Sequence, residues 1–137
     1  MIAIPQDDTQ AAYWYRKAVD QGYAEAQLNL GRAYTNVQGV PKDDAQAVYW
    51  LHKAADQGNA LAQFGLGMKY GQCAGVTKDS VIALMWVYVS YVYSEGTPFQ
   101  EKVVEMINNL TTHFTEQQIT EAQQRAKIWI AAHPKKN

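Results

Sequence analysis

The sequence contains a single cysteine, Cys73, among its 137 residues, so no disulfide can form within the chain. An excess of charge of one sign is also lacking, because 12 Lys and Arg residues stand against 13 Asp and Glu residues, for a net charge of −1. This balance gives no electrostatic attraction to nucleic acids or to anionic membrane surfaces, and we expect neither as a partner.

Long hydrophobic runs are absent as well. The most apolar stretch, VIALMWVYVSYVY at residues 81–93, is shorter than the roughly 20 residues that a bilayer span requires, so we expect no membrane insertion. The N-terminus, MIAIPQDD, has no basic start and no room for the apolar core of a signal peptide. The sequence is compatible with a cytoplasmic protein, or with a periplasmic or secreted protein from which a leader has been removed. The compartment stays open.

Clusters of catalytic or metal-binding residues are not visible in the sequence. His52, His113 and His133 are far apart along the chain, and Cys73 has no histidine beside it. His52 and Cys73 could approach each other in space, but no other residue marks a catalytic pair. The chain has no glycine-rich phosphate loop and no His-x-x-x-His or Cys-x-x-Cys motif. We therefore expect a protein that is not an enzyme, with no cofactor and no metal.

The sequence does contain an internal repeat. Residues 7–22 read DDTQAAYWYRKAVDQG, and residues 43–58 read DDAQAVYWLHKAADQG. Self-similarity at such a period is typical of stacked repeat arrays. A third, more diverged copy begins near Thr77. We predict one repeat domain over residues 1–137, with repeats at about 5–40, 41–76 and 77–112 and a capping helix at about 115–132.

Each copy predicts two helices, A and B. Helix A begins at an acidic cap such as Asp43 or Asp79 and carries an apolar stripe with helical spacing. It ends at Gly22 or Gly58, where glycine adopts the left-handed conformation without a clash. Helix B contains a glycine, Gly31 or Gly67, that costs up to about 1 kcal/mol relative to alanine. We expect close packing at these glycines, beneath a neighbouring tryptophan. The tryptophans assigned to the core are Trp14, Trp50, Trp86 and Trp129.

The C-terminal part departs from the repeat. Thr97-Pro98 predicts the cap and first-turn proline of a helix that runs to about Leu110. The T-x-x-Q run that begins at Thr115 fits a capping box, and the helix it starts ends at His133-Pro134. An array of repeats must finish with one polar face, which a closing helix provides.

The third copy places apolar residues where the first two copies have Gln, Tyr and Lys. These residues are Ile82, Met85 and Val89. Two explanations are open: the closing helix covers them, or they form an exposed patch for a partner or for self-association. We favour the closing helix.

The repeated pattern resembles the Sel1-like repeat, a relative of the tetratricopeptide repeat. The run A-x-x-W-x-x-K-A-A-x-x-G at residues 47–58 and the run A-x-A-Q-x-x-L-G-x-x-Y at residues 60–70 carry the resemblance, which extends over about residues 5–96. The chain departs from the family where Val37 and Cys73 replace a usual glycine. The first copy has no helix B before it, which leaves open that the chain is the C-terminal part of a longer array.

The resemblance implies an all-α fold, an α/α right-handed superhelix (solenoid) of tandem 36-residue helix-turn-helix repeats with a C-terminal capping helix. In such a fold the A helices line a concave face. Family members typically act as non-enzymatic adaptors that hold proteins or peptides. The function implied here is a protein–protein or protein–peptide interaction scaffold that binds through this concave face.

Two tyrosines, Tyr13 and Tyr49, precede the tryptophan of their repeats and lie off the apolar stripe. With the cationic residues near them they predict a partner-binding row. The predicted residues are Tyr13, Arg16, Lys17, Tyr49, His52 and Lys53. Three alternatives remain: an ordinary solvated helix face, a homo-oligomer built through the apolar third repeat, and a small-ligand or hydrolytic protein that uses the same groove.

Overall fold

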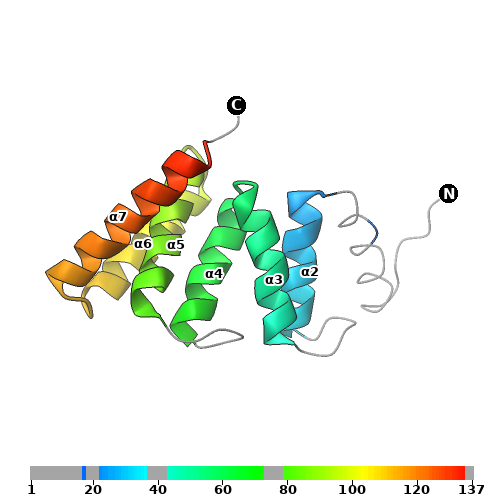
Figure 1. Cartoon of the computed structure of the whole chain (residues 1–137), viewed down its shortest axis with the longest axis horizontal. Helices are drawn as coiled ribbons and strands as arrows, with labels where there is room; N and C mark the ends of the chain where they lie inside the picture. Colours follow the sequence, from blue (N-terminus) through cyan, green and yellow to red (C-terminus); the bar gives the residue numbers. More distant parts are fainter. Residues whose placement is uncertain (1–16, 18–21, 37–42, 73–78, 135–137) are drawn as a thin grey trace.

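The computed structural model describes residue 17 and residues 22–36, 43–72 and 79–134, and in these residues every regular element is an α-helix. Helices α3 and α5 are A helices, α2, α4 and α6 are B helices, and α7 closes the array. Figure 1 shows the helices in a row along the long axis, with α6 behind α5. The predicted all-α solenoid is confirmed. The bounds are α2 Ala24–Asn36, α3 Asp44–Asp56, α4 Ala60–Gln72, α5 Ser80–Tyr93, α6 Phe99–Thr111 and α7 Glu116–Ala132.

The start of each described A helix is set by an aspartate cap, as predicted. The Asp43 carboxylate accepts a hydrogen bond from the Gln46 amide at 3.1 Å, and the Asp79 carboxylate accepts one from the Ile82 amide at 3.0 Å. Each bond satisfies one backbone N–H group that has no partner within the helix. At the other end of α3, Gly58 has a φ of 91°, the left-handed conformation that glycine adopts without strain.

The predicted cap at Thr97 is wrong. Its hydroxyl donates to the carbonyl oxygen of Ser94 at 2.7 Å, and α6 begins one residue after Pro98 with no side-chain cap. Ser94 ends α5, and the left-handed glycine of this repeat is Gly96, with a φ of 81°. The longer turn therefore uses Thr97 to stabilise the end of α5 instead of the start of α6.

The capping box of α7 is confirmed. The Thr115 hydroxyl accepts from the Gln118 amide at 3.1 Å, and the Gln118 side chain accepts from the Thr115 amide at 3.0 Å. The helix ends at Ala132 with His133 as its C-cap, which also agrees with the prediction.

The glycine in the middle of each B helix allows the next A helix to approach closely. A Cβ atom on Gly67 would lie 2.8 Å from Cγ2 of Val87 and 3.0 Å from the carbonyl oxygen of Ala83. Gly31 makes the corresponding approach one repeat earlier, to Leu51 and to the carbonyl oxygen of Ala47. Close packing was predicted correctly, but the neighbour is the backbone of the next A helix with an aliphatic side chain, and not a tryptophan.

The core is continuous from α2 to α7, and α5 lies at its centre. Trp86 on α5 is only 4% exposed, and seven residues of this helix are buried because it packs against α4, α6 and α7. Trp50 and Trp129 pack against core clusters but remain partly exposed, and Trp14 lies outside the described residues. Every helix in the described part of the chain is too short or too polar to cross a bilayer.

Candidate partner-binding surface

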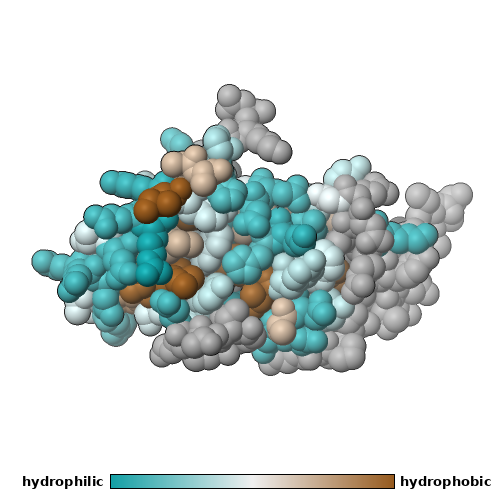
Figure 2. Space-filling model, in the orientation of Figure 1, coloured by the Kyte–Doolittle hydropathy of each residue, from teal (hydrophilic) through white to brown (hydrophobic). Residues whose placement is uncertain are grey.

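Helix α3 exposes a row of four side chains along one face. Gln46, Tyr49, Lys53 and Asp56 are all exposed, and their spacing of three and four residues places them on a single stripe of the helix. We call this row, together with the exposed Lys17 of the first repeat, the A-helix face. Figure 2 shows the molecule in the view of Figure 1, with a mainly hydrophilic to intermediate surface over α3.

Tyr49 is the largest exposed group of the A-helix face, with 50% of the residue accessible to solvent. Its ring packs edge-on against Trp50 at a centroid distance of 4.8 Å. The Lys53 Nζ lies 5.4 Å from the ring centre, which is within the range of a cation–π contact worth about 0.5–1 kcal/mol at an exposed site. These two contacts favour one orientation of the tyrosine ring, while half of the residue stays exposed to solvent.

His52 differs from its neighbours because it is partly buried between helices. Its Nε2 lies 3.2 Å from the Tyr70 hydroxyl, within hydrogen-bond distance, and its ring meets Trp86 edge-on at 5.6 Å. Burial lowers the pKa of His52 below 6.5, although the nearby Asp56 carboxylate raises it in part. Burial and the Asp79 carboxylate raise the pKa of Tyr70. His52 links α3 to α4 and α5 beneath the exposed row.

The structure describes only one residue of the predicted partner-binding row in the first repeat. Lys17 is exposed, whereas Tyr13 and Arg16 lie outside the described residues. By the repeat register, Tyr13, Arg16 and Lys17 correspond to Tyr49, His52 and Lys53.

Helix α7 closes one end of the A-helix face. On α5, the positions that correspond to the exposed row of α3 are Ile82, Met85 and Val89. Met85 and Val89 are buried in one cluster with Ala126 of α7. The Trp129 ring lies 5.2 Å from the Trp86 ring. The prediction that the closing helix covers the apolar third repeat is therefore confirmed for Met85 and Val89, while Ile82 packs against the same cluster and stays partly exposed.

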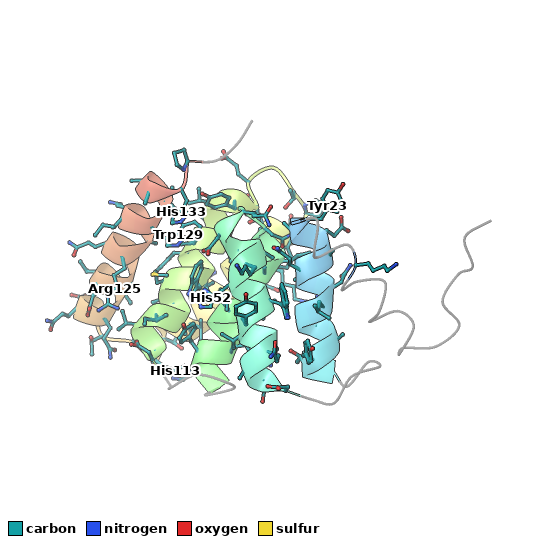
Figure 3. All side chains as sticks on the ribbon, turned by 45° about the vertical axis from the view of Figure 1, so that its right-hand side comes forward. Tyr23, His52, His113, Arg125, Trp129 and His133 are labelled. Atoms are coloured by element: carbon teal, nitrogen blue, oxygen red, sulfur yellow. The ribbon has the colours of Figure 1, made fainter. Side chains whose placement is uncertain are left out.

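The three histidines lie in different parts of the molecule, as Figure 3 shows. His52 is on α3, His113 follows α6, and His133 stacks on Trp129 at 3.9 Å at the end of α7. In the part of the chain that the structure describes, no three His, Cys, Asp or Glu side chains come together as a metal site. Cys73 lies outside that part.

The sequence reasoning missed a groove on the B helices, which is described below. Its signal was present in the repeat alignment: Leu61 and Met68 of the second repeat replace Glu25 and Arg32 of the first. These four positions are on the outer side of helix B, so the change exposes two apolar side chains where the first repeat has charged ones.

The chain belongs to the Sel1 repeat family. The Sel1 repeat matches residues 2–23, 24–59 and 60–90, which together make up more than half of the chain. Members of this family generally mediate protein–protein interactions and are generally non-catalytic scaffolds. No curated protein matches the chain.

Two solved structures share the fold. One is c5321, described as a protective antigen present in uropathogenic Escherichia coli strains displaying an SLR fold; it is 31% identical with a TM-score of 0.83 over 95% of this chain. The other is a Sel1 repeat protein from Oxalobacter formigenes, 25% identical with a TM-score of 0.71 over 94% of this chain. The matches cover 27% and 52% of those two chains, so this chain spans only part of their length.

Proposed function

We propose that this chain is a non-enzymatic scaffold that binds a protein or peptide partner through its A-helix face. The general role of the Sel1 repeat family supports the proposal. Of the residues predicted from the sequence, Lys17, Tyr49 and Lys53 belong to this face and are the proposed contacts. Tyr13 and Arg16 hold the matching register positions of the first repeat, and His52 supports the row from beneath.

The observation that carries the proposal is the state of Tyr49. Its ring is half exposed, yet it is oriented by Trp50 and Lys53. An aromatic side chain that is already ordered loses little conformational entropy on binding, and tyrosine is enriched at protein interfaces. Lys53 and Gln46 beside it offer hydrogen-bond donors to a peptide backbone or to carboxylates.

The alternative functions gain less support. Self-association through Met85 and Val89 would require α7 to move away, because both residues are buried under it. A hydrolytic reaction would need neighbouring catalytic groups, and the three histidines lie apart.

The test is affinity capture from a lysate of the native cells, with wild type compared with Tyr49→Ala/Lys53→Ala. The matched control is Tyr23→Ala, because Tyr23 is 59% exposed but lies on the turn before α2 and is not part of the row on α3. We expect the same captured proteins with wild type and with Tyr23→Ala, and loss of at least one of them with the double variant. Capture that is equal for all three folded proteins would contradict the proposal.

A further inference from the structure

A groove lies on the side of the molecule formed by the B helices. It is a cavity of about 440 Å³, and we define this B-helix groove by Arg32 of α2, by Leu61, Phe64 and Met68 of α4, and by Lys102 of α6. It is opposite the A-helix face, because Leu51 lies under the groove and is rotated by about 200° around α3 from Tyr49. A site here would be separate from the proposed A-helix site.

The groove is apolar, and two of its apolar side chains are open to solvent. Its base includes Leu28, Leu51 and Phe64, all nearly buried, while Leu61 is 37% exposed and Met68 is 41% exposed. The corresponding residues of the first repeat are charged, so the helix B architecture does not require apolar side chains at these positions. Methionine is flexible and polarizable, and it adapts to the shape of a bound group.

The charged side chains that line the groove are all cations. Arg32 and Lys102 are exposed on α2 and α6, on either side of α4, and neither forms an ion pair with another described residue. The third cation, Lys69, is nearly buried and paired with Asp44 at 2.9 Å. Among the described residues that line the groove there is no carboxylate. The two exposed cations therefore favour a ligand with negative charge at both ends of an apolar part.

We propose that the B-helix groove binds a segment of a partner protein in which bulky apolar side chains are flanked by acidic residues. The apolar side chains fill the cavity over Phe64 and Met68, and the flanking carboxylates meet Arg32 and Lys102. The volume lies within the range of about 300–1,000 Å³ that is typical of ligand pockets. Burial of apolar side chains provides affinity, and the two cations select the acidic flanks.

The experiment uses two pools of short fluorescein-labelled peptides, measured by fluorescence polarisation with the full chain. One pool has one or two Leu, Phe or Met residues flanked on both sides by Glu or Asp, and the other has Lys in place of the acidic residues. The groove variant is Leu61→Glu/Met68→Arg, which inserts the residues that the first repeat has at these positions. The charge variant is Arg32→Glu/Lys102→Glu, and the control is Tyr49→Ala/Lys53→Ala on the A-helix face. Circular dichroism verifies that each variant is folded.

We expect wild type to bind the acidic pool in preference to the lysine pool, and more weakly as salt concentration rises. The groove variant should lose roughly tenfold or more in affinity, the charge variant should prefer the lysine pool, and the control should bind like wild type. Equal binding of both pools, binding of neither, or unchanged affinity in the folded groove variant would overturn the proposal. A wild-type dimer in sedimentation equilibrium that Leu61→Glu/Met68→Arg dissociates would also overturn it, because it would assign the groove to a second copy of this chain.

Discussion

At the scale of single residues, Trp50 and Trp86 have different environments although they occupy the same repeat register. Trp86 is enclosed by helices on several sides, whereas Trp50 packs against the cluster formed by Ala26 and Leu30 and stays partly exposed. The difference arises because α7 covers α5, while α3 keeps its outer side open. The equivalent sequence positions therefore contribute unequally to stability.

This difference predicts unequal costs of truncation. Trp86→Ala should lower the free energy of unfolding by about 3–5 kcal/mol, because it removes a fully buried ring and leaves a cavity. Trp50→Ala should cost less, about 2 kcal/mol, because its ring is only partly removed from water. Urea denaturation followed by circular dichroism measures both values. Equal losses for the two variants would contradict the assigned environments.

His52 predicts a dependence of stability on pH. Its pKa is lowered in the folded state by burial, so below 6.5 the unfolded chain binds the proton more readily. The contribution of His52 to stability should be complete above pH 6.5 and should be lost as the pH falls from there towards the folded pKa. His52→Gln should reduce this slope in urea denaturation measured across that range, and His113→Gln, at an exposed position, serves as the control. A slope that is the same in His52→Gln and wild type would show that another group is responsible.

At the scale of elements, the interface between each helix B and the next helix A depends on a missing side chain. Gly67 lies against Val87 and the Ala83 carbonyl, and Gly31 makes the matching contact one repeat earlier. The contact to a backbone carbonyl cannot be relieved by a rotamer change. The glycine therefore sets the distance between the two helices.

Gly67→Ala should destabilise the chain by about 1–3 kcal/mol, although alanine itself favours the helix by up to about 1 kcal/mol. The matched control is Gly65→Ala on the same helix, where the new Cβ would be 3.5 Å from the side chain of Leu51, an ordinary contact. We expect Gly65→Ala to be neutral or stabilising. Thermal or urea unfolding compares the two variants, and a Gly67→Ala protein as stable as Gly65→Ala would refute close helix packing as the reason for this glycine.

The helix caps show which local features the sequence can predict and which it cannot. The caps at Asp43, Asp79 and Thr115 were predicted correctly because each depends on residues within one turn of the helix. The Thr97 cap was wrong because its hydroxyl has a competing acceptor, the carbonyl of Ser94, in a turn that the first two repeats do not share.

In the candidate site, helical spacing in the sequence correctly predicted the exposed residues Tyr49 and Lys53 on α3. The same prediction placed His52 among the exposed residues, although it is partly buried. Its partial burial depends on Tyr70 and Trp86, which come from two other helices. The B-helix groove likewise needs residues from α2, α4 and α6 together, and such contacts between distant segments are not encoded by local periodicity.

At the scale of the whole molecule, the solenoid has two different faces. The A-helix face carries an ordered tyrosine beside polar groups and is closed at one end by α7, whereas the B-helix groove is apolar with cations on both sides. With both proposed sites occupied, two surfaces of such different chemistry would let one scaffold hold two partners at the same time. Variants on each face are separable because the two sets of residues do not overlap.

The most direct test of the central claim places a photo-crosslinking amino acid, p-benzoylphenylalanine, at position 49 of the chain in its native cells. The control places it at position 23, which is also an exposed tyrosine. The account predicts a discrete adduct with a partner protein from position 49 after irradiation, and none of that size from position 23. No adduct from position 49, or the same adduct from both positions, would contradict binding through the A-helix face.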